Sequence, residues 1–307
     1  KYSTNYYYNQ LSKDEKALWD ALDKVCIHYL EEKETVSTTL SGVAVLDNVS
    51  VSFKMSVQEL HEFWQIFMLS NPQYYFLRNR YYYYYDASGN VQSVHLTIYD
   101  AFKDGGKRAS ATKKIKKQIA NWEDIIKEYD TEAEKVKVIH DLICKKVSYN
   151  YPVYEDFYIS DEEEAQCFSQ SAYSVFCTDL TVCAGYSDTM AMMCNGAGLD
   201  AVSVTSHDHQ WNKVRINDVW YNYDLTRGDA NDDAIYYGAF ARSDAESQKD
   251  GSSYIEEAFW ADYSPKAKLD TAPSDPWSAP GTYPTISKQT KTPLIQVTRT
   301  DKGYTVK

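Results

Sequence analysis

The stretch TVCAGYSDTMAMMCNGAGL, residues 181–199, places a cysteine at the first position of a predicted helix. Alanine and methionine give this helix its apolar content, and Gly196 and Gly198 are suited to cap its C-terminus. A thiol that only fills a core could lie anywhere along the helix, as Cys194 does. At the start of a helix, however, the backbone dipole favours the thiolate form. The sequence therefore indicates that Cys183 is a nucleophile.

A β-hairpin is predicted shortly after this helix. Its strands are QWNKVRI, residues 210–216, and VWYNYDLT, residues 219–226. Asn217 and Asp218 join the two strands, and such a pair is typical of tight turns. One face of the hairpin carries mainly apolar and aromatic side chains, so we expect this face to pack on a core.

The register of the hairpin brings a histidine and an aspartate together. Pairing outward from the turn places Asp224 opposite Trp211, and His209 opposite Thr226. His209 and Asp224 then become diagonal neighbours on one face, with α-carbons roughly 7–8 Å apart. A carboxylate that holds an imidazole fixes its tautomer, so that the histidine can act first as a base and then as an acid. Together with Cys183, these two residues supply a nucleophile, an acid/base and an orienting group.

An acyl intermediate also needs hydrogen-bond donors for its oxyanion. The backbone N–H of Cys183 is one expected donor. The second should come from upstream, where Gln170 and Tyr173 are the candidates. Trp211 and Tyr186 are expected to support the site.

Three linked motifs around these residues resemble the core of the bacterial transglutaminase-like superfamily. They are VCAGYS (182–187), HQWNKV (209–214) and WYNYDLT (220–226). The resemblance covers about residues 131–240 and implies a papain-like α+β fold with a Cys183–His209–Asp224 triad. It also implies acyl transfer through a thioester, with water or an amine as acceptor and with no metal or other cofactor.

One position departs from the family pattern. Members often read D-x-T-W-x-D after the triad aspartate, whereas this chain has Arg227 in place of the tryptophan. The change leaves the triad intact but alters the wall of the cleft. Arg227-Gly228-Asp229 also spells an integrin-type tripeptide, although three-residue matches are common by chance.

Two further histidine-containing segments have simpler interpretations. His207 and His209 alternate on a strand and could bind a metal, but no second pair of ligands has zinc spacing, and Asp224 already accounts for His209. His140 lies on a predicted helix over residues 132–146 that faces a core, so we expect it to be structural.

The composition limits the classes of partner. The net charge is −12 and there is no sustained basic run, which argues against nucleic acid because phosphate binding needs a cationic surface. No apolar run approaches the roughly 20 residues that span a membrane. Six cysteines in 307 residues are too few for a disulfide scaffold, and pairing of Cys167 with Cys177 stays open.

Local signals predict the remaining elements. Capping boxes mark helix starts at Ser12–Glu15, Ser56–Glu59 and Thr131–Glu134, and a further helix is expected over residues 111–129. Strands are expected within residues 35–46 and 49–56 and on both sides of the DASGN loop, residues 86–90. The run Tyr81–Tyr85, just before this loop, should pack as a strand, and the alternative is that its rings form a ligand-binding platform.

Three parts are predicted along the chain. Residues 1–110 form a smaller N-terminal α+β region, residues 111–262 form the transglutaminase-like core, and residues 263–307 form a Pro/Ser/Thr-rich linker and C-terminal extension.

Two functions follow from these observations. The first is a cysteine acyltransferase or peptidase that acts on amide bonds of proteins or peptides, including cell-wall peptides. The resemblance implies a secreted or cell-surface protein of a Gram-positive bacterium, and the start at Lys1 suggests that a signal peptide has been removed. The second is a catalytically silent surface module that binds protein or cell-wall glycan through tyrosine-rich surfaces.

Overall fold

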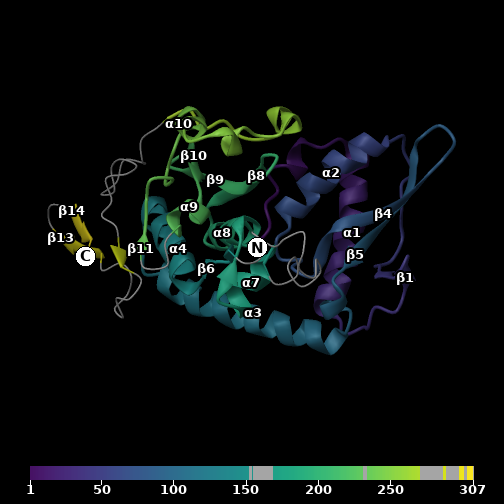
Figure 1. Cartoon of the computed structure of the whole chain (residues 1–307), viewed down its shortest axis with the longest axis horizontal. Coiled ribbons are helices and arrows are strands. Elements are labelled where there is room, and N and C mark those ends of the chain that lie inside the picture. The colour runs from purple at the N-terminus through teal and green to yellow at the C-terminus, as the bar shows by residue number, and fades with distance from the viewer. Residues whose placement is uncertain are drawn as a thin grey trace.

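The computed structural model describes residues 1–151, 154, 169–230 and 234–269, and the backbone of three short strand segments beyond them. Figure 1 shows two groups of elements joined along one side by the long helix α3 (Gly105–Ile126). The first group contains α1, α2, β4 and β5, and the second is built around α8 and the strands β8 to β10.

A helix and a three-stranded antiparallel sheet form the centre of the second group. The helix is α8 (Cys183–Gly196), and the strands β8 (Asp200–Thr205), β9 (Gln210–Ile216) and β10 (Val219–Tyr223) lie in the order β10-β9-β8. The predicted hairpin register is confirmed from Val219–Ile216 to Tyr223–Asn212. Its turn residues, Asn217 and Asp218, have φ values of 49° and 65°, which match a hairpin turn of the primed type.

The predicted pairing is wrong beyond Tyr223. Asp224 leaves the sheet and becomes the N-cap of the short helix α9 (Leu225–Gly228), so Thr226 is helical and does not face His209 across a ladder. The reason is local, because the Asp224 carboxylate accepts the backbone N–H of Thr226 at 3.0 Å. Such a bond competes with strand pairing and favours a helix start.

Helices pack around α8. They are α4 (Glu132–Lys146), α7 (Ala172–Cys177) and α9, and α3 packs on α4 and α7. The bounds of α4 agree with the predicted range, and its Thr131–Glu134 capping box is formed. The predicted helix over residues 111–129 is also present but begins earlier, at Gly105, where Asp104 caps it.

The N-terminal part combines two helices with a second antiparallel sheet. The helices are α1 (Lys13–Glu31) and α2 (Val57–Ser70), and both predicted capping boxes are formed. The sheet has the order β3-β5-β4, with β3 (Val49–Ser50), β4 (Leu77–Tyr85) and β5 (Val91–Ile98). Strand structure within residues 35–46 is limited to the short pair β1 (Thr39–Leu40) and β2 (Val43–Ala44).

The tyrosine run 81–85 belongs to β4, as predicted. Tyr81, which packs on Trp64 with ring centroids 5.3 Å apart, is partly buried. Tyr84 and Tyr85 are 53% and 63% exposed. The run therefore contributes packing at its start and exposed rings at its end.

One continuous set of buried apolar residues includes members of both parts of the chain. The predicted boundary between residues 110 and 111 falls inside α3, which contacts α1 on one side and α4 and α7 on the other. The three-part division of the chain stays a prediction.

A segment after the sheet returns across β9 and β10. It contains α10 (Asp244–Lys249), η3 (Ser252–Tyr254) and η4 (Ala258–Asp262). Buried Lys213 on β9 anchors this segment through ion pairs to Asp244 at 3.0 Å and Glu256 at 2.6 Å. Since Asn212 bonds to α8 and neighbouring strand residues point to opposite faces, the segment covers the face of the sheet away from α8.

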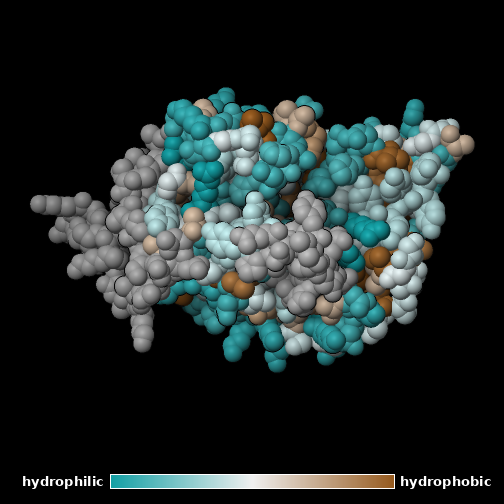
Figure 2. Space-filling model, in the orientation of Figure 1, coloured by the Kyte–Doolittle hydropathy of each residue, from teal (hydrophilic) through white to brown (hydrophobic). Residues whose placement is uncertain are grey.

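The remaining elements are short. They are η1 (Tyr8–Gln10), η2 (Asp100–Phe102), the parallel pair β6 (Ser148–Tyr149) and β7 (Leu180–Thr181), and the antiparallel pairs β11 (Ala234–Ile235) with β12 (Ile286–Ser287) and β13 (Val297–Thr300) with β14 (Gly303–Val306). None of the helices that the structure describes is both long and apolar enough to cross a lipid bilayer. In Figure 2, hydrophilic residues cover most of the described part of the visible face, with apolar residues only in small groups.

Candidate active site

Cys183 is the first residue of α8 and is partly exposed. The amides of a first helical turn have no partner within the helix, so the N–H of Cys183 is available to an oxyanion. Gly185 lets this turn lie close to the preceding segment, because a Cβ there would be 1.9 Å from Thr181 Oγ1 and 2.6 Å from Ser174 Oγ. The glycine of the VCAGYS motif therefore has a packing reason.

His209 bridges Cys183 and Asp224. Its Nε2 lies 2.8 Å from Asp224 Oδ2, and the Cys183 side chain lies close enough to its ring to raise its pKa. Burial lowers the pKa of His209, but the charge and hydrogen bond of Asp224, together with those of Cys183, outweigh it and raise the pKa to about 10. At neutral pH the imidazole is therefore protonated and poised as an acid.

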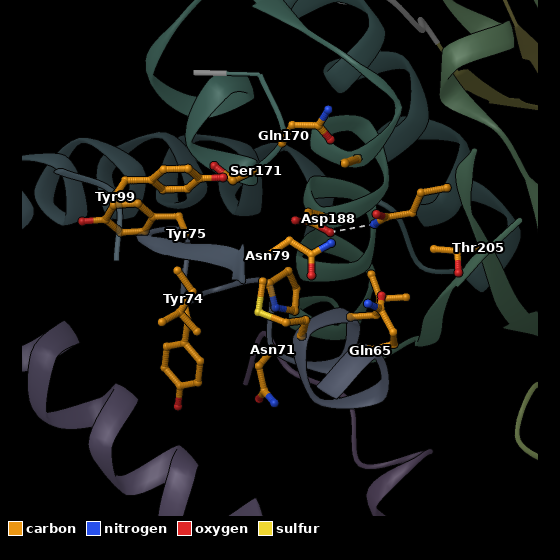
Figure 3. Close-up of a pocket in the computed structure, with 16 residues that line it drawn as sticks. Gln65, Asn71, Tyr74, Tyr75, Asn79, Tyr99, Gln170, Ser171, Asp188 and Thr205 are labelled. Carbon is orange, nitrogen blue, oxygen red and sulfur yellow. Dashed lines mark hydrogen bonds between the residues drawn. The ribbon is translucent and has the colours of Figure 1, made fainter. Parts of the chain in front are cut away.

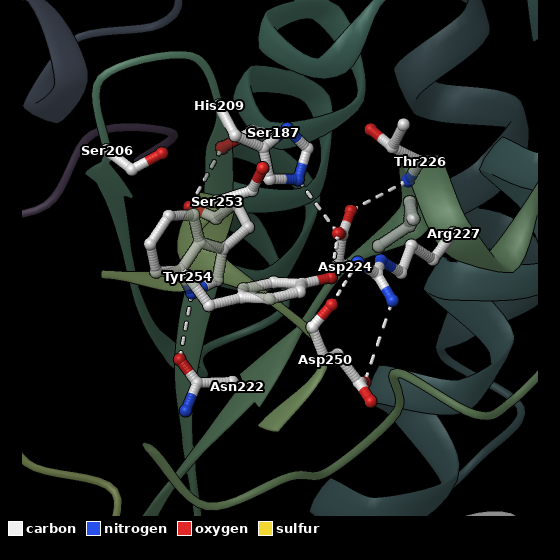
Figure 4. Close-up of polar contacts among 12 residues, drawn as sticks. Ser187, Ser206, His209, Asn222, Asp224, Thr226, Arg227, Asp250, Ser253 and Tyr254 are labelled. Atoms are coloured by element: carbon white, nitrogen blue, oxygen red, sulfur yellow. Dashed lines mark hydrogen bonds and ion pairs between the residues drawn. The ribbon is translucent and has the colours of Figure 1, made fainter. Parts of the chain in front are cut away.

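Asp224 is 3% exposed, and both of its oxygens have partners. Oδ1 accepts the N–H of Thr226, while Oδ2 accepts hydrogen bonds from His209 and from the Tyr254 hydroxyl (Figure 4). Burial raises the pKa of this carboxyl, but His209, Tyr254 and the Arg227 charge reverse the effect and hold the pKa below its usual range. The carboxylate is thus ionised and held in one orientation.

Cys183 and His209 open on a cleft of about 780 Å³, a size suited to a substrate. Its lining comprises Tyr149, Tyr151, Tyr154, Gln170, Val182, Cys183, His207, Asp208, His209, Thr226, Arg227, Ala230 and Ser253. The rings of Tyr149 and Tyr151 lie 4.9 Å apart and form an aromatic wall. The candidate nucleophile is therefore accessible from outside the protein.

The two candidates for the second oxyanion donor lie in different places. Gln170 lines the cleft together with Cys183. Tyr173 is not among the cleft-lining residues; its ring packs on Tyr75 and Phe102, with centroids 5.9 and 5.0 Å away. Only Gln170 is positioned for the predicted role, because Tyr173 is a core-packing residue on α7.

Trp211 and Tyr186 support the site from below the surface. Trp211 stacks on the His209 ring at 5.9 Å, and its indole N–H donates to Asn222 at 2.9 Å. Tyr186 donates its hydroxyl hydrogen to Asp229 and stacks on Tyr149 of the cleft wall. Both side chains are at most 2% exposed.

Sequence analysis missed Tyr254. This residue lies in the returning segment, donates to Asp224 and meets the His209 ring edge-on at 5.8 Å. Arg227 packs over its ring at 4.9 Å and pairs with Asp250, so the departure from the family tryptophan places a cation beside the triad. No local motif marks Tyr254, since only the fold brings it to Asp224.

The other sequence interpretations can also be placed. Asp229 is 1% exposed and bonded to Tyr186, so the Arg-Gly-Asp tripeptide is not presented to an integrin. His140 is buried and bonded to Asp141, as expected for a structural residue. Within the described part of the chain, no group of three or more His, Cys, Asp or Glu side chains could hold a metal ion. Cys177 is a free thiol, and Cys167 lies outside the described residues.

Comparison with known proteins identifies one region of the chain. Residues 120–225 match the family model of the transglutaminase-like superfamily. The chain is 27% identical over 128 residues to kyphoscoliosis peptidase from Homo sapiens, and 26% identical over 121 residues to the same peptidase from Mus musculus. These matches cover 36% and 34% of this chain but only 18% and 17% of the relatives, so the chain spans less than a fifth of their length.

Two solved structures show a weak likeness. One is the crystal structure of a TGase, with a TM-score of 0.34, 15% identity and coverage of 65% of this chain and 56% of the other. The second is a protein from Cytophaga hutchinsonii described as a candidate cysteine protease, with a TM-score of 0.27, 12% identity and coverage of 63% and 70%. The family match is confined to residues 120–225, and this region, which contains Cys183, His209 and Asp224, is similar to the transglutaminase-like superfamily.

Proposed function

We propose that this protein is a cysteine acyltransferase or peptidase that acts on amide bonds of proteins or peptides through a thioester on Cys183. The observation that carries the proposal is the position of His209, which bonds to Asp224 and lines the same cleft as Cys183. A catalytic cysteine needs a neighbouring base that a third group orients, whereas a buried structural thiol needs neither.

The geometry supports a sequence of balanced steps. The Cys183 thiolate attacks the amide carbonyl carbon, and the resulting oxyanion is held by the Cys183 N–H and by Gln170. His209 donates its proton to the nitrogen as the C–N bond breaks, which releases an amine and leaves a thioester. His209 then removes a proton from water or from a second amine as it attacks the thioester. Collapse of this intermediate returns the thiolate.

The proposed substrate is a protein or peptide, including peptides of a bacterial cell wall. We propose that the protein acts outside the cell or at the cell surface of a Gram-positive bacterium, which rests on the family resemblance. Fractionation of the source cells, with a specific antibody, checks this location.

Thiol labelling tests the catalytic proposal. The protein is treated with iodoacetamide between pH 5 and 9, and adducts are mapped by mass spectrometry in the parent and in His209→Ala. Cys183 should label fastest of the cysteines, and the variant should slow it. Cys177 is a matched internal control because it is also partly exposed, while burial raises its pKa to about 11. Labelling of Cys183 no faster than Cys177 would contradict the proposal.

The alternative is a silent module that binds protein or cell-wall glycan. Exposed Tyr84 and Tyr85 are the observation in its favour. Against it, Cys183 is not sealed from solvent but lines the cleft together with His209. Unaltered glycan binding after Tyr84→Ser and Tyr85→Ser, together with fast labelling of Cys183, would dismiss this alternative.

A further inference from the structure

A second cavity lies beside the cleft and is not used by the triad. It measures about 250 Å³ and is enclosed by residues from α2, β4, α8 and the segment before α7. Gln170 lines both the cavity and the cleft, and Ala184, the neighbour of Cys183, lines the cavity. The cavity therefore adjoins the candidate nucleophile.

The size of this cavity suits one side chain. Sites for whole drug-sized ligands occupy roughly 300–1,000 Å³, which is more than this space provides. A cavity of this size beside a reactive thiol is suited to one residue of a longer substrate that also occupies the cleft.

The lining mixes apolar side chains with hydrogen-bonding groups and includes no cation among the described residues. Carboxamides and hydroxyls of Gln65, Asn71, Asn79, Gln170, Ser171, Thr205 and Gln210 surround a carboxyl group, that of Asp188 (Figure 3). Among the described residues that line the cavity, none is Lys, Arg or His. Ser171 is 6% exposed, and its hydroxyl has no hydrogen-bond partner in the described part of the chain. The lining therefore offers no positive charge to an anion. It also keeps one buried hydroxyl, that of Ser171, without a hydrogen-bond partner among the described residues.

Asp188 differs from the fully buried carboxylates. Asp141 pairs with Lys137, and Asp224 pairs with His209. Asp188 receives one hydrogen bond, from Gln210 at 2.8 Å, and no cation among the described residues reaches it. Burial raises the pKa of Asp188 to about 7, and the Gln210 bond offsets this only in part. Asp188 is partly buried, and an ionised carboxyl in such a place without a counter-charge is costly, a cost that an incoming cation would relieve.

We propose that this cavity receives the cationic side chain, lysine or arginine, of a peptide substrate and that Asp188 is its counter-ion. The presence of a peptide in the cleft rests on the proposed function. The net charge of −12 also favours the approach of a basic peptide.

The spacing of the two sites agrees with this assignment. Asp188 follows Cys183 by five residues on α8, which corresponds to roughly 7.5 Å along the helix axis. Neighbouring residues of an extended peptide are about 3.8 Å apart. A residue one or two positions from the reacting carbonyl can therefore place its side chain in the cavity.

Binding to a protein that cannot turn over tests the proposal. In the Cys183→Ala background, with methionine methyl groups labelled with ¹³C, Nα-acetyl-lysine N-methylamide and its arginine analogue are titrated by NMR. Nα-acetyl-norleucine N-methylamide is the neutral comparison. Of the five methionines, Met68 lines the cavity, so its resonance, assigned by Met68→Leu, should shift.

Asp188→Asn should weaken both cationic probes at least about tenfold, because a charge-assisted hydrogen bond is lost while the shape stays the same. The matched control is Asp124→Asn, an exposed carboxyl on α3 that lines neither space and should change nothing. Equal binding of the norleucine and lysine probes would overturn the proposal. So would unchanged binding in Asp188→Asn, or a shift at other methionines without one at Met68.

The comparison of probes in the Cys183→Ala protein needs no change at Asp188, so the test holds even if Asp188→Asn fails to fold. It is also separate from the catalytic proposal. If the Cys183 thiol proves inert while lysine binds through Asp188, the cavity assignment stands and the proposed function falls. If Cys183 is reactive while the charged and neutral probes bind equally, the proposed function stands and the cavity assignment falls.

Discussion

Two of the histidine–aspartate pairs in the described part of the chain lie mainly below the surface, and they differ in what surrounds them. His209 opens on the cleft beside Cys183, with 12% of its side chain exposed, and Asp224 lies buried behind it. His140 and Asp141 lie at 2.9 Å within the interior, where at most 1% of either side chain is exposed. The inner pair shares its carboxylate with Lys137 at 2.9 Å and with the Tyr237 hydroxyl at 2.8 Å.

The difference shows that the pair alone does not make a catalytic site. The inner carboxylate is saturated by partners from α4 and Tyr237, and no thiol or cleft is part of that cluster. Gly228 fits against it, since a Cβ there would lie 2.6 Å from His140 Nε2. The inner pair therefore joins α4 to α9, whereas the outer pair is available for proton transfer.

The largest effect is expected for Asp224→Asn. Loss of the carboxylate removes the group that orients and charges His209, so the rate of acyl transfer should fall about 10³–10⁴-fold. The global fold should be retained, because asparagine keeps the shape. Steady-state kinetics with a labelled peptide amide, beside far-UV circular dichroism, make the measurement. A fall of less than tenfold would show that the outer pair is no more functional than the inner one.

The inner cluster should respond in the opposite way. Lys137→Met leaves Asp141 buried without its lysine, and the free energy of unfolding should fall by about 3–5 kcal/mol. Urea unfolding measures this loss, while iodoacetamide labelling of Cys183 at low urea should proceed at the parent rate. A slowed thiol with unchanged stability would assign the inner cluster to the catalytic machinery.

A smaller effect is expected for Tyr254→Phe. The variant removes a hydrogen bond to a charged group, typically about 1.5–3 kcal/mol, and so should slow acyl transfer at least about tenfold. A merely structural tyrosine would alter stability only, so the readout is the pH profile of Cys183 labelling together with the rate. Tyr237→Phe is the matched control, because it removes the equivalent hydroxyl bond from the inner carboxylate. Equal effects of both variants on labelling would refute the positioning role.

The smallest effect, expressed per pH unit, is expected for the contribution of His209 to the free energy of unfolding. The folded-state pKa of His209 is about 10, above the 6.5 of an ordinary histidine, so its contribution to stability is complete below about pH 6.5. That contribution should be lost as the pH rises towards 10, by at most about 1.4 kcal/mol per pH unit. Urea unfolding of the parent and of His209→Gln between pH 6 and 10.5 isolates it. The parent should lose its advantage in free energy of unfolding over the variant as the pH rises. An advantage that grows with pH would contradict the prediction.

Much of the site could be predicted because its signals are local. The three capping boxes, the Asn217-Asp218 turn and the cysteine at the start of α8 each depend on residues a few positions apart. The hairpin register then sufficed to bring His209 near Asp224, even though its last pairs were wrong. Asp224 failed as a strand residue because its side chain capped α9 instead.

The remainder depends on contacts between distant segments. Tyr254 reaches Asp224 across 30 positions, and contacts of its segment with distant residues, among them the ion pairs of Lys213, hold it there. Tyr173 was a reasonable oxyanion candidate by position, but packing of α7 against Tyr75 and Phe102 turned it inward. Neither outcome leaves a mark in the local sequence.

The sequence by itself determined the helix that begins at Cys183 and the hairpin before Asp224, because dipoles, caps and tight turns act over a few residues. Only the tertiary structure decided that Tyr254 completes the environment of Asp224 and that Asp188 faces a cavity without a cation. Burial and counter-charge are properties of the whole packed chain, since residues of the N-terminal helix α2 and strand β4 supply one side of that cavity. The physical reason is that desolvation depends on every neighbour in space, whatever its place in the sequence.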